Sequence, residues 1–88
     1  MSKKRSDIEI YVDILKVATG GAKKSHIVYK ANLNFKIIKK YLSNLRESGM
    51  IADSEDINNI YKTTPKGLKY VDHFEGLRDY MARSSLAS

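Results

Sequence analysis

The segment Ser25–Ile51, "SHIVYKANLNFKIIKKYLSNLRESGMI", contains two apolar and lysine-rich runs separated by the short polar break Asn32-Leu33-Asn34. Asparagine adopts positive φ more readily than most residues, and it also caps helix N-termini. The break therefore predicts a compact corner in which the first asparagine turns the chain, the leucine points inward and the second asparagine caps the next helix. We expect a short helix at about 25–31, with Ser25 as a possible N-cap, and a longer one at about 35–48.

The longer helix is predicted to have two different sides. At about 100° per residue, its apolar residues fall on one side, and lysines with small polar residues fall on the other. The predicted core side contains Phe35, Ile38, Tyr41, Leu42 and Leu45. The predicted outward side contains Lys36, Lys40, Ser43 and Glu47, with Ile37 and Asn44 at its edge. Gly49 stands where a glycine commonly ends a helix.

Helices and a hairpin are predicted on either side of this pair. Upstream, Ser6-Asp7-Ile8-Glu9 matches a capping box and opens a predicted helix at about 6–19, which a glycine pair ends. Downstream, two short apolar-leaning stretches at 50–54 and 60–64 around the polar turn at 55–59 predict a β-hairpin. Thr64-Pro65 then begins a last helix that runs to about residue 82, because a capping hydroxyl followed by proline is a typical helix start.

The chain has 88 residues and a formal net charge of +6, and this charge is unevenly distributed. Residues 1–46 contain eleven Lys or Arg against three acidic residues, whereas residues 47–88 contain five against seven. The net charge is therefore +8 in the first part and −2 in the second. Charge that only served solubility would be scattered more evenly, so we expect one electropositive face that fits a polyanionic partner.

The predicted elements occur in the order of a winged helix-turn-helix: helix, short helix, corner, lysine-rich helix, hairpin and final helix. The predicted fold class is therefore mainly α with a small β-hairpin (α+β), and the chain length allows one domain with one core. We expect residues 1–64 to form the winged helix-turn-helix domain. Residues 65–83 are expected to form a C-terminal helix that packs on this domain and on a partner subunit, and residues 84–88 a flexible tail.

Two segments also resemble a known family. "KKSHIVYKANLNFKIIKKYLSNLRESGMI" (23–51), followed by "YKTTPKGLKYVDHF" (61–74), is similar to small archaeal winged-helix DNA-binding proteins of about this size, which include nucleoid-associated and repressor-like proteins. The shared pattern is "K-x-x-I-x-Y-x-A-N-L", then "Y-L-x-x-L", "G-x-I" and "Y-x-x-T-x-K-G". The similarity extends from about residue 6 to residue 80.

The resemblance implies a cytoplasmic transcriptional regulator or nucleoid-associated protein that binds double-stranded DNA as a homodimer. The last helices of the dimer would pack as an antiparallel coiled coil, and the helix at 35–48 would enter the major groove. The expected DNA-binding residues are Lys23, Lys24, Ser25, Asn34, Lys36, Lys39, Lys40, Ser43, Asn44 and Arg46. Lys3, Lys4 and Arg5 are expected to reach the DNA backbone as an arm.

The last helix carries two apolar stripes. Leu68 and Val71 are expected to face the core of their own domain. The second stripe follows alternating steps of four, three and four residues, which is the spacing of a coiled-coil seam. This predicted dimer interface consists of Tyr70, Phe74, Leu77 and Met81. The alternative is that the helix folds back over its own domain and buries the stripe there.

The hairpin, or wing, departs from the usual pattern of the family. Wings commonly carry basic residues that approach DNA, whereas Asp53, Glu55 and Asp56 would repel it. We therefore expect only a minor contribution from the wing, through Lys62 at its base and Asn58 or Asn59 at its tip.

Several function classes lack a sequence signal. There is no cysteine, and His26 and His73 have no paired ligand at useful spacing, so we expect no metal site. No catalytic or phosphate-loop motif is found, which predicts a non-enzyme without cofactor or small-molecule substrate. No apolar run is long enough to cross a membrane. The alternatives to DNA binding are a protein-interaction module of the same fold, used in transcription or complex assembly, and an RNA-binding protein.

Overall fold

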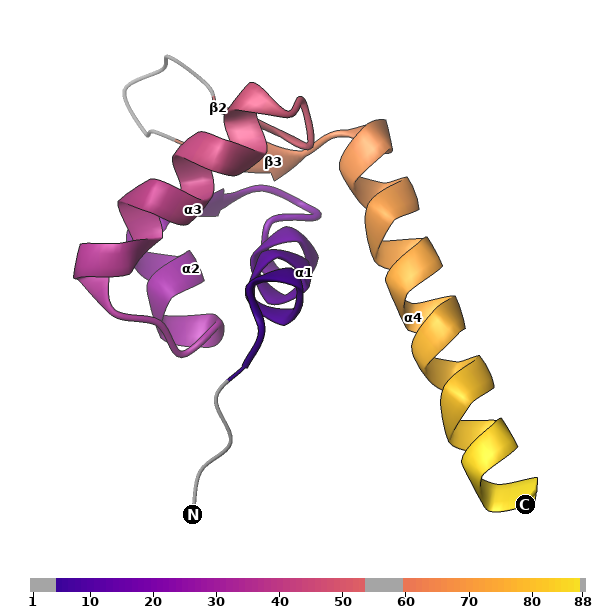
Figure 1. Cartoon of the computed structure of the whole chain (residues 1–88). Coiled ribbons are helices and arrows are strands. Elements are labelled where there is room, and N and C mark those ends of the chain that lie inside the picture. The colour runs from indigo at the N-terminus through magenta and orange to yellow at the C-terminus, as the bar shows by residue number, and fades with distance from the viewer. Residues whose placement is uncertain (1–4, 54–59, 88) are drawn as a thin grey trace.

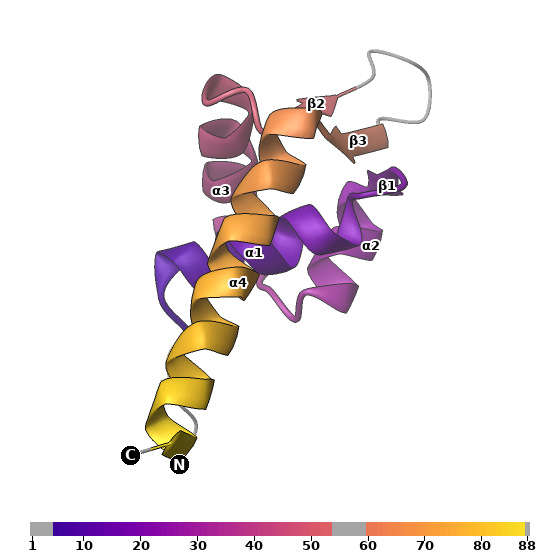
Figure 2. The same cartoon turned by 90° about the vertical axis from the view of Figure 1, so that its right-hand side faces the viewer.

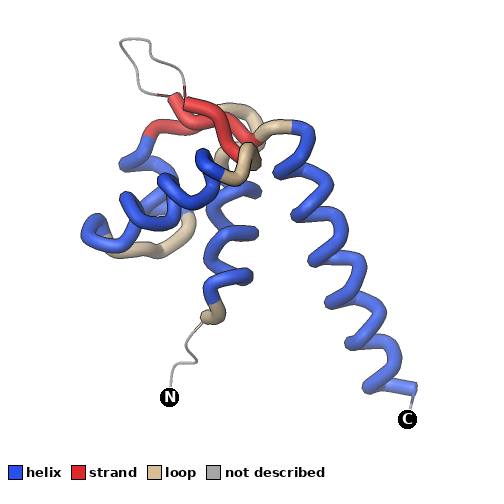
Figure 3. The backbone as a smooth tube through the Cα atoms, turned by 45° about the horizontal axis from the view of Figure 1, so that its top comes forward, coloured by secondary structure: helices blue, strands red, loops and turns tan. Residues whose placement is uncertain are grey.

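The computed structural model describes residues 5–53 and 60–87, and the side chains of these residues up to Ala82. The chain is mainly helical with a small sheet, as predicted (Figure 1). Its elements are, in order, α1 (Asp7–Val17), β1 (Ala22–Lys23), α2 (Lys24–Lys30), α3 (Phe35–Glu47), β2 (Ile51–Asp53), β3 (Ile60–Thr63) and α4 (Pro65–Ala87). The strands lie together at one end of the helices, as the tube in Figure 3 shows.

The first helix begins with the predicted capping box. The backbone N–H of Ser6 donates to Glu9 Oε1 at 2.9 Å, and the backbone N–H of Glu9 donates to Ser6 Oγ at 3.2 Å. The hydrogen bond from the Ser6 backbone lowers the pKa of the Glu9 carboxyl, because it favours the charged form. At the other end of α1, Gly21 adopts a φ of +97° and turns the chain into β1.

The sheet has three antiparallel strands in the order β1-β3-β2, one more than the hairpin predicted from sequence. In the additional pairing, Ala22 lies opposite Tyr61, and Lys23 lies opposite Ile60. A strand of two residues shows no alternating pattern, so its sequence gave no signal. Because Lys23 is extended and serves as the N-cap of α2 without a side-chain hydrogen bond, the prediction that Ser25 caps this helix is wrong.

The corner between α2 and α3 forms as predicted. Asn32 has a φ of +55°, and the backbone N–H of Leu33 donates to the carbonyl of Val28 at 2.9 Å. Asn34 Oδ1 accepts a hydrogen bond from the backbone N–H of Lys36 at 2.7 Å and so caps α3. Leu33 is half-buried against the core. Each residue of the polar break therefore has the role expected of it.

The core lies between α1, α2, α3 and the sheet, and its fully buried side chains are Ile14, Leu15, Ile27, Ile38 and Ile51. Four of the five predicted core residues of α3 are buried, but Phe35 is 59% exposed. Phe35 is the first residue of α3, so it lies beyond the end of the buried stripe. The predicted face was correct, whereas the predicted burial of Phe35 was wrong.

The last helix begins at a tight junction with the sheet. Thr64 Oγ1 accepts from the backbone N–H of Gly67 at 3.2 Å and donates to the Gly49 carbonyl at 2.6 Å, which confirms Thr64 as the cap. Thr63 Oγ1, which is buried, donates to the Leu15 carbonyl at 2.7 Å. These bonds connect the start of α4 to the end of α3 and to α1.

The first half of α4 packs along α1, and its second half extends beyond the other helices (Figures 1 and 2). Lys16 Nζ donates to Glu75 Oε2 at 2.9 Å across this contact, and the bond lowers the pKa of Glu75. Val71 packs on the core as predicted, but Leu68 is 43% exposed. The helix also continues to Ala87, past the expected end near residue 82 and through most of the segment expected to be a tail.

Two glycines of α4 provide a test of the junction. A Cβ atom at Gly67 would meet the Met50 carbonyl oxygen, and it would lie 2.7 Å from Thr63 Cγ2, whereas a Cβ at Gly76 would meet nothing within 4 Å. We expect Gly67→Ala to lower the free energy of unfolding by about 1–3 kcal/mol through overpacking. Gly76→Ala, the matched control, should raise it by up to about 1 kcal/mol through helix propensity. Urea unfolding at one protein concentration measures both, and equal effects of the two substitutions would contradict this description of the junction.

Candidate nucleic-acid interface

The outward side of α3 carries exposed cations. Lys36, Lys39 and Lys40 are exposed, and Ser43 is half-buried between them and the sheet. Within residues 5–53 and 60–82 the structure contains three ion pairs, and none involves these lysines. The start of α4 lies against the end of α3, but its projecting half lies on the other side of α1 from α2 and α3 (Figure 1).

A depression of about 220 Å³ lies where α2, α3 and β3 meet. It is lined by Lys24, Lys39, Leu42, Ser43, Arg46 and Tyr61. Three cationic side chains from two helices therefore surround one hollow, together with hydroxyl groups from Ser43 and Tyr61. Such a combination of positive charge and hydrogen-bond donors suits an anionic group such as a backbone phosphate.

Tyr61 was not among the residues predicted for this site. It lies at the centre of the sheet, opposite both Ala22 and Asp53. Its place beside the depression depends on the pairing of β1 with β3, which the sequence did not reveal. A hairpin pattern alone could have indicated only that Tyr61 alternates with its neighbours along the strand.

Arg46 is less free than predicted. Its Nη1 donates to Asp53 Oδ2 at 3.0 Å, so the guanidinium partly neutralises the acidic base of the wing. The Arg46 side chain remains 53% exposed, and an ion pair this open contributes little stability. Because a guanidinium has five N–H donors, Arg46 retains donors besides the one that binds Asp53, and it lines the depression.

Asn44 makes a hydrogen bond to α1 that the sequence did not predict. Its Nδ2 donates to the Tyr11 hydroxyl of α1 at 2.8 Å. It also lines a second depression, of about 250 Å³, together with Tyr11, Leu45, Ser48, Met50 and Tyr70. Asn44 is exposed one turn after Lys40, so its entry into the groove with Ser43 stays a prediction, and in the free protein its side chain bonds α1.

The start of α2 lies beside the depression. Lys23 and Ser25 are exposed and Lys24 is half-buried, so Lys23 and Lys24 add positive charge next to α3. Asn34 is exposed at the N-terminus of α3, where its side-chain oxygen is used by the cap. The amide nitrogen of Asn34 is then the group left for an outside partner.

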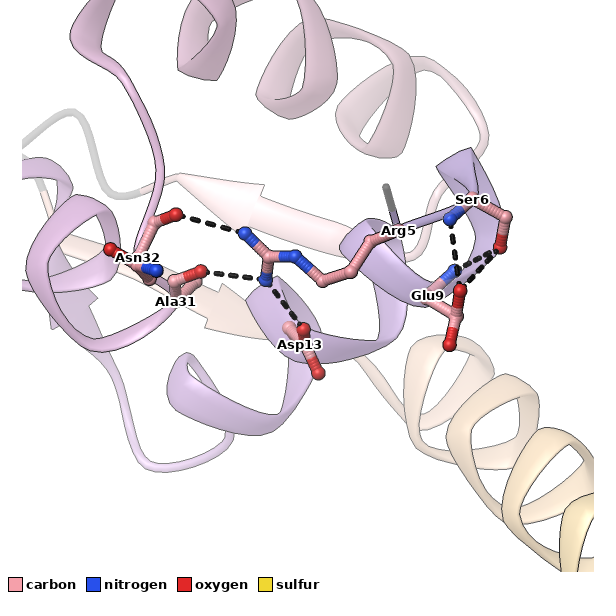
Figure 4. A network of polar contacts seen from close by, with 6 residues as sticks. All are labelled: Arg5, Ser6, Glu9, Asp13, Ala31 and Asn32. Carbon is pink, nitrogen blue, oxygen red and sulfur yellow. Dashed lines mark hydrogen bonds and ion pairs between the residues drawn. The ribbon is translucent and has the colours of Figure 1, made fainter. Parts of the chain in front are cut away.

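The predicted N-terminal arm is wrong at Arg5, and Lys3 and Lys4 lie outside the described residues. Arg5 folds back onto its own domain, as Figure 4 shows, and donates to Asp13 Oδ2 and to the carbonyls of Ala31 and Asn32, each at 2.8 Å. The wing tip, with Glu55, Asp56, Asn58 and Asn59, also lies outside the described residues. Lys62 is exposed at the base of the wing.

The predicted dimer stripe divides into two parts. Tyr70 is half-buried against its own core, and burial raises the pKa of its hydroxyl. Phe74 is also half-buried, with the Arg78 guanidinium carbon 5.7 Å from its ring centre. Leu77 and Met81 are 59% and 62% exposed, and Tyr80, which was not predicted, is 69% exposed. Among the described side chains of α4, the most exposed apolar residues therefore lie on its projecting half, and Leu68 in the first half is exposed to a lesser degree.

No helix within the described part of the chain is long and apolar enough to span a membrane. Nor do the described side chains include a group of three or more His, Cys, Asp or Glu residues that could hold a metal ion.

Comparison with known proteins assigns the family. Residues 4–82 match the winged helix-turn-helix family, and the chain therefore belongs to it. A solved structure of Sso10a-2, a DNA-binding protein from Sulfolobus solfataricus, is 27% identical in sequence, with a TM-score of 0.77 and 94% of each chain covered. These findings confirm the resemblance to small archaeal winged-helix DNA-binding proteins. Among proteins of curated function, none matches the chain significantly.

Two bacterial regulators share the fold at lower identity. MepR, a transcription regulator of the Staphylococcus aureus multidrug efflux pump MepA, has a TM-score of 0.78 at 18% identity, with 93% of this chain and 63% of that chain covered. BpsR of Bordetella bronchiseptica, whose DNA binding is regulated by 6-hydroxynicotinic acid, has a TM-score of 0.72 at 16% identity, with 94% and 61% covered. Both regulators are longer than this chain, and at these identities the similarity concerns the fold alone.

Proposed function

We propose that the protein binds double-stranded DNA as a homodimer and acts in the cytoplasm as a transcriptional regulator or nucleoid-associated protein. The observation that carries this proposal is the exposed cationic side of α3, with Lys36, Lys39 and Lys40, next to the basic depression where α2 and α3 meet. The similarity to Sso10a-2, a DNA-binding protein, supports it. As a DNA-binding protein, the chain would need no cofactor and would catalyse no reaction.

In the proposed complex, α3 lies in the major groove, which is wide enough to admit a helix. Lys36, Lys40 and Ser43 then face the groove, and the amide of Asn34 lies at the entering end of the helix. Lys23, Lys24 and Lys39 lie nearer the edge of the groove, where they and the free donors of Arg46 can bind phosphate oxygens. Lysine contacts of this kind fix position more than sequence, so we expect strong dependence on salt and modest sequence preference.

The proposed domain organisation assigns each half of α4 a different contact. The first half, through Tyr70 and Val71, packs on residues of its own winged helix-turn-helix domain. The projecting half has Leu77, Tyr80 and Met81 at steps of three and one, so that all three share one side of the helix. Exposed apolar groups on one side of a projecting helix suit a second copy of the same helix.

Salt-dependent binding of duplex DNA tests the first part of the proposal. If each dimer neutralises about six phosphates, log affinity should fall with log salt concentration at a slope of about −5. Lys39→Glu should weaken binding by at least about tenfold at low salt and make the slope shallower by about 2, because each dimer loses two phosphate contacts.

The matched control is Lys69→Glu, which makes the same charge change on an exposed residue of α4. Fluorescence anisotropy with a labelled duplex gives both quantities. Equal effects of the two substitutions, with folding intact, would instead support a protein-interaction module. The deep, narrow groove of A-form RNA excludes α3, so we expect an RNA duplex of the same length to compete more weakly than a DNA duplex. Stronger competition by the RNA duplex would support RNA binding.

Solution mass tests the dimer. The chain of 10.0 kDa should behave as a particle of two copies in light scattering. Leu77→Glu together with Met81→Glu should shift it to one copy, because four carboxylates would be brought together in the paired helices. Tyr29→Glu, at a side chain on α2 that is 80% exposed, is the control and should leave the mass unchanged. A single-copy mass for the unmodified protein at high concentration would exclude the proposed homodimer.

A further inference from the structure

Arg5 makes a contact that the predicted DNA-binding arm does not explain. Its Nη1 donates to Asp13 Oδ2 and to the Ala31 carbonyl, and its Nη2 donates to the Asn32 carbonyl (Figure 4). All three donor–acceptor distances are 2.8 Å. The Arg5 side chain is 32% exposed and that of Asp13 40%, so water only partly screens this ion pair.

The two carbonyl groups follow directly after the last residue of α2. Carbonyls at a helix C-terminus have no partner within the helix and carry partial negative charge, so a cation placed there stabilises the helix end. Asn32, whose carbonyl accepts one of these bonds, is also the residue with a φ of +55° that turns the chain toward α3. Arg5 therefore binds the point at which the direction of α3 is set.

The same N-terminal segment holds α3 itself. The Tyr41 hydroxyl of α3 donates to Asp7 Oδ1 at 2.7 Å, and this bond raises the pKa of Tyr41. The Tyr41 ring packs edge-on against Tyr11 of α1, with 5.1 Å between ring centres. The beginning of α1 is thus connected to two places: through Arg5 to the corner before α3, and through Asp7 to the middle of α3.

We propose that Arg5 is a positioning residue for DNA binding: by joining Asp13 to the carbonyls of Ala31 and Asn32, its guanidinium fixes the angle at which α3 is presented, without contacting DNA. This inference rests on the proposed function. Arginine suits the role because its planar fork reaches separate acceptors at once, whereas a lysine ammonium is a single point of charge. Loss of the fork leaves two helix-end carbonyls and one carboxylate without this partner.

The sign of the effect of Asp13→Asn distinguishes positioning from direct contact. Removing a negative charge strengthens DNA binding if electrostatic attraction alone matters, and more so if it releases Arg5 toward a phosphate. If Arg5 is a positioning residue, Asp13→Asn weakens binding even though the protein becomes more positive. Arg5→Gln should weaken binding by about tenfold, which corresponds to the loss of a hydrogen bond between charged groups.

The experiment measures duplex affinity by anisotropy for Arg5→Gln, Arg5→Lys, Asp13→Asn and the double variant Arg5→Gln/Asp13→Asn. Lys69→Gln is the charge-matched control for Arg5→Gln. We expect the double variant to bind no worse than Arg5→Gln alone, because both substitutions remove the same interaction. Arg5→Lys, which keeps the charge, should still bind more weakly than the unmodified protein.

A readout without DNA separates this inference from the proposed function. In amide NMR spectra of the free protein, Arg5→Gln and Asp13→Asn should shift the resonances of Asn32, Leu33 and Asn34, whereas Lys69→Gln should not. Three results would each overturn the positioning role: unchanged resonances of the corner residues, tighter DNA binding by Asp13→Asn, or an equal loss of DNA affinity with Arg5→Gln and Lys69→Gln. If Arg5→Gln does not fold, Arg5→Lys and Asp13→Asn decide by the same criteria. Absence of duplex binding by the unmodified protein would overturn the proposed function and, with it, the positioning of α3 for DNA.

Discussion

The arrangement of the molecule depends on the corner between α2 and α3. Asn32 in the left-handed region ends one helix, and Asn34 begins the next by capping it. An N-cap of this kind contributes about 1 kcal/mol, and the left-handed conformation carries a cost that asparagine bears better than most residues. The half-buried Leu33 and the hydrogen bonds from Arg5 keep the corner in this form. Without it, the lysines of α3 would have no fixed direction.

The corner also explains how so short a chain separates two surfaces. Once α3 is fixed against α2, its apolar side closes the core with α1, and its lysines remain outside. The sheet then returns the chain to the far side of α1, where α4 begins at the junction between Thr64 and Gly49. Helix α3 and the projecting half of α4 consequently lie on opposite sides of α1 (Figure 1), so that one can meet a polyanion while the other meets a partner subunit.

Much of this fold was predictable, because local chemistry determines it. The capping box at Ser6, the corner at Asn32 and the cap at Thr64 each depend on residues only a few positions apart, and all three formed as expected. The winged helix-turn-helix fold was then predicted from the order of the helices and the hairpin along the chain. Features that depend on distant partners were missed: β1 forms by pairing with β3, and α2 begins directly after it with Lys23, instead of Ser25, at the N-cap.

The candidate site was predictable in outline and less so in detail. Helical periodicity identified the outward lysines of α3, but it did not show that Asn44 would bond Tyr11 or that Arg46 would bond Asp53. Nor did the sequence indicate that Arg5 would fold onto a corner 26 residues away along the chain. These corrections have one cause: a polar side chain at the edge of a helix takes the nearest complementary group, and only the tertiary structure decides which group is nearest.

The most direct test of whether α3 faces the nucleic acid is an amide NMR titration of the labelled protein with a short DNA duplex. We predict that the largest shifts cluster at Lys23–Ser25, at the N-terminus of α3 and along its lysine side, with Leu77–Met81 unaffected. Shifts concentrated on the projecting half of α4, or spread evenly over the surface without the α3 cluster, would contradict the claim that α3 faces the nucleic acid.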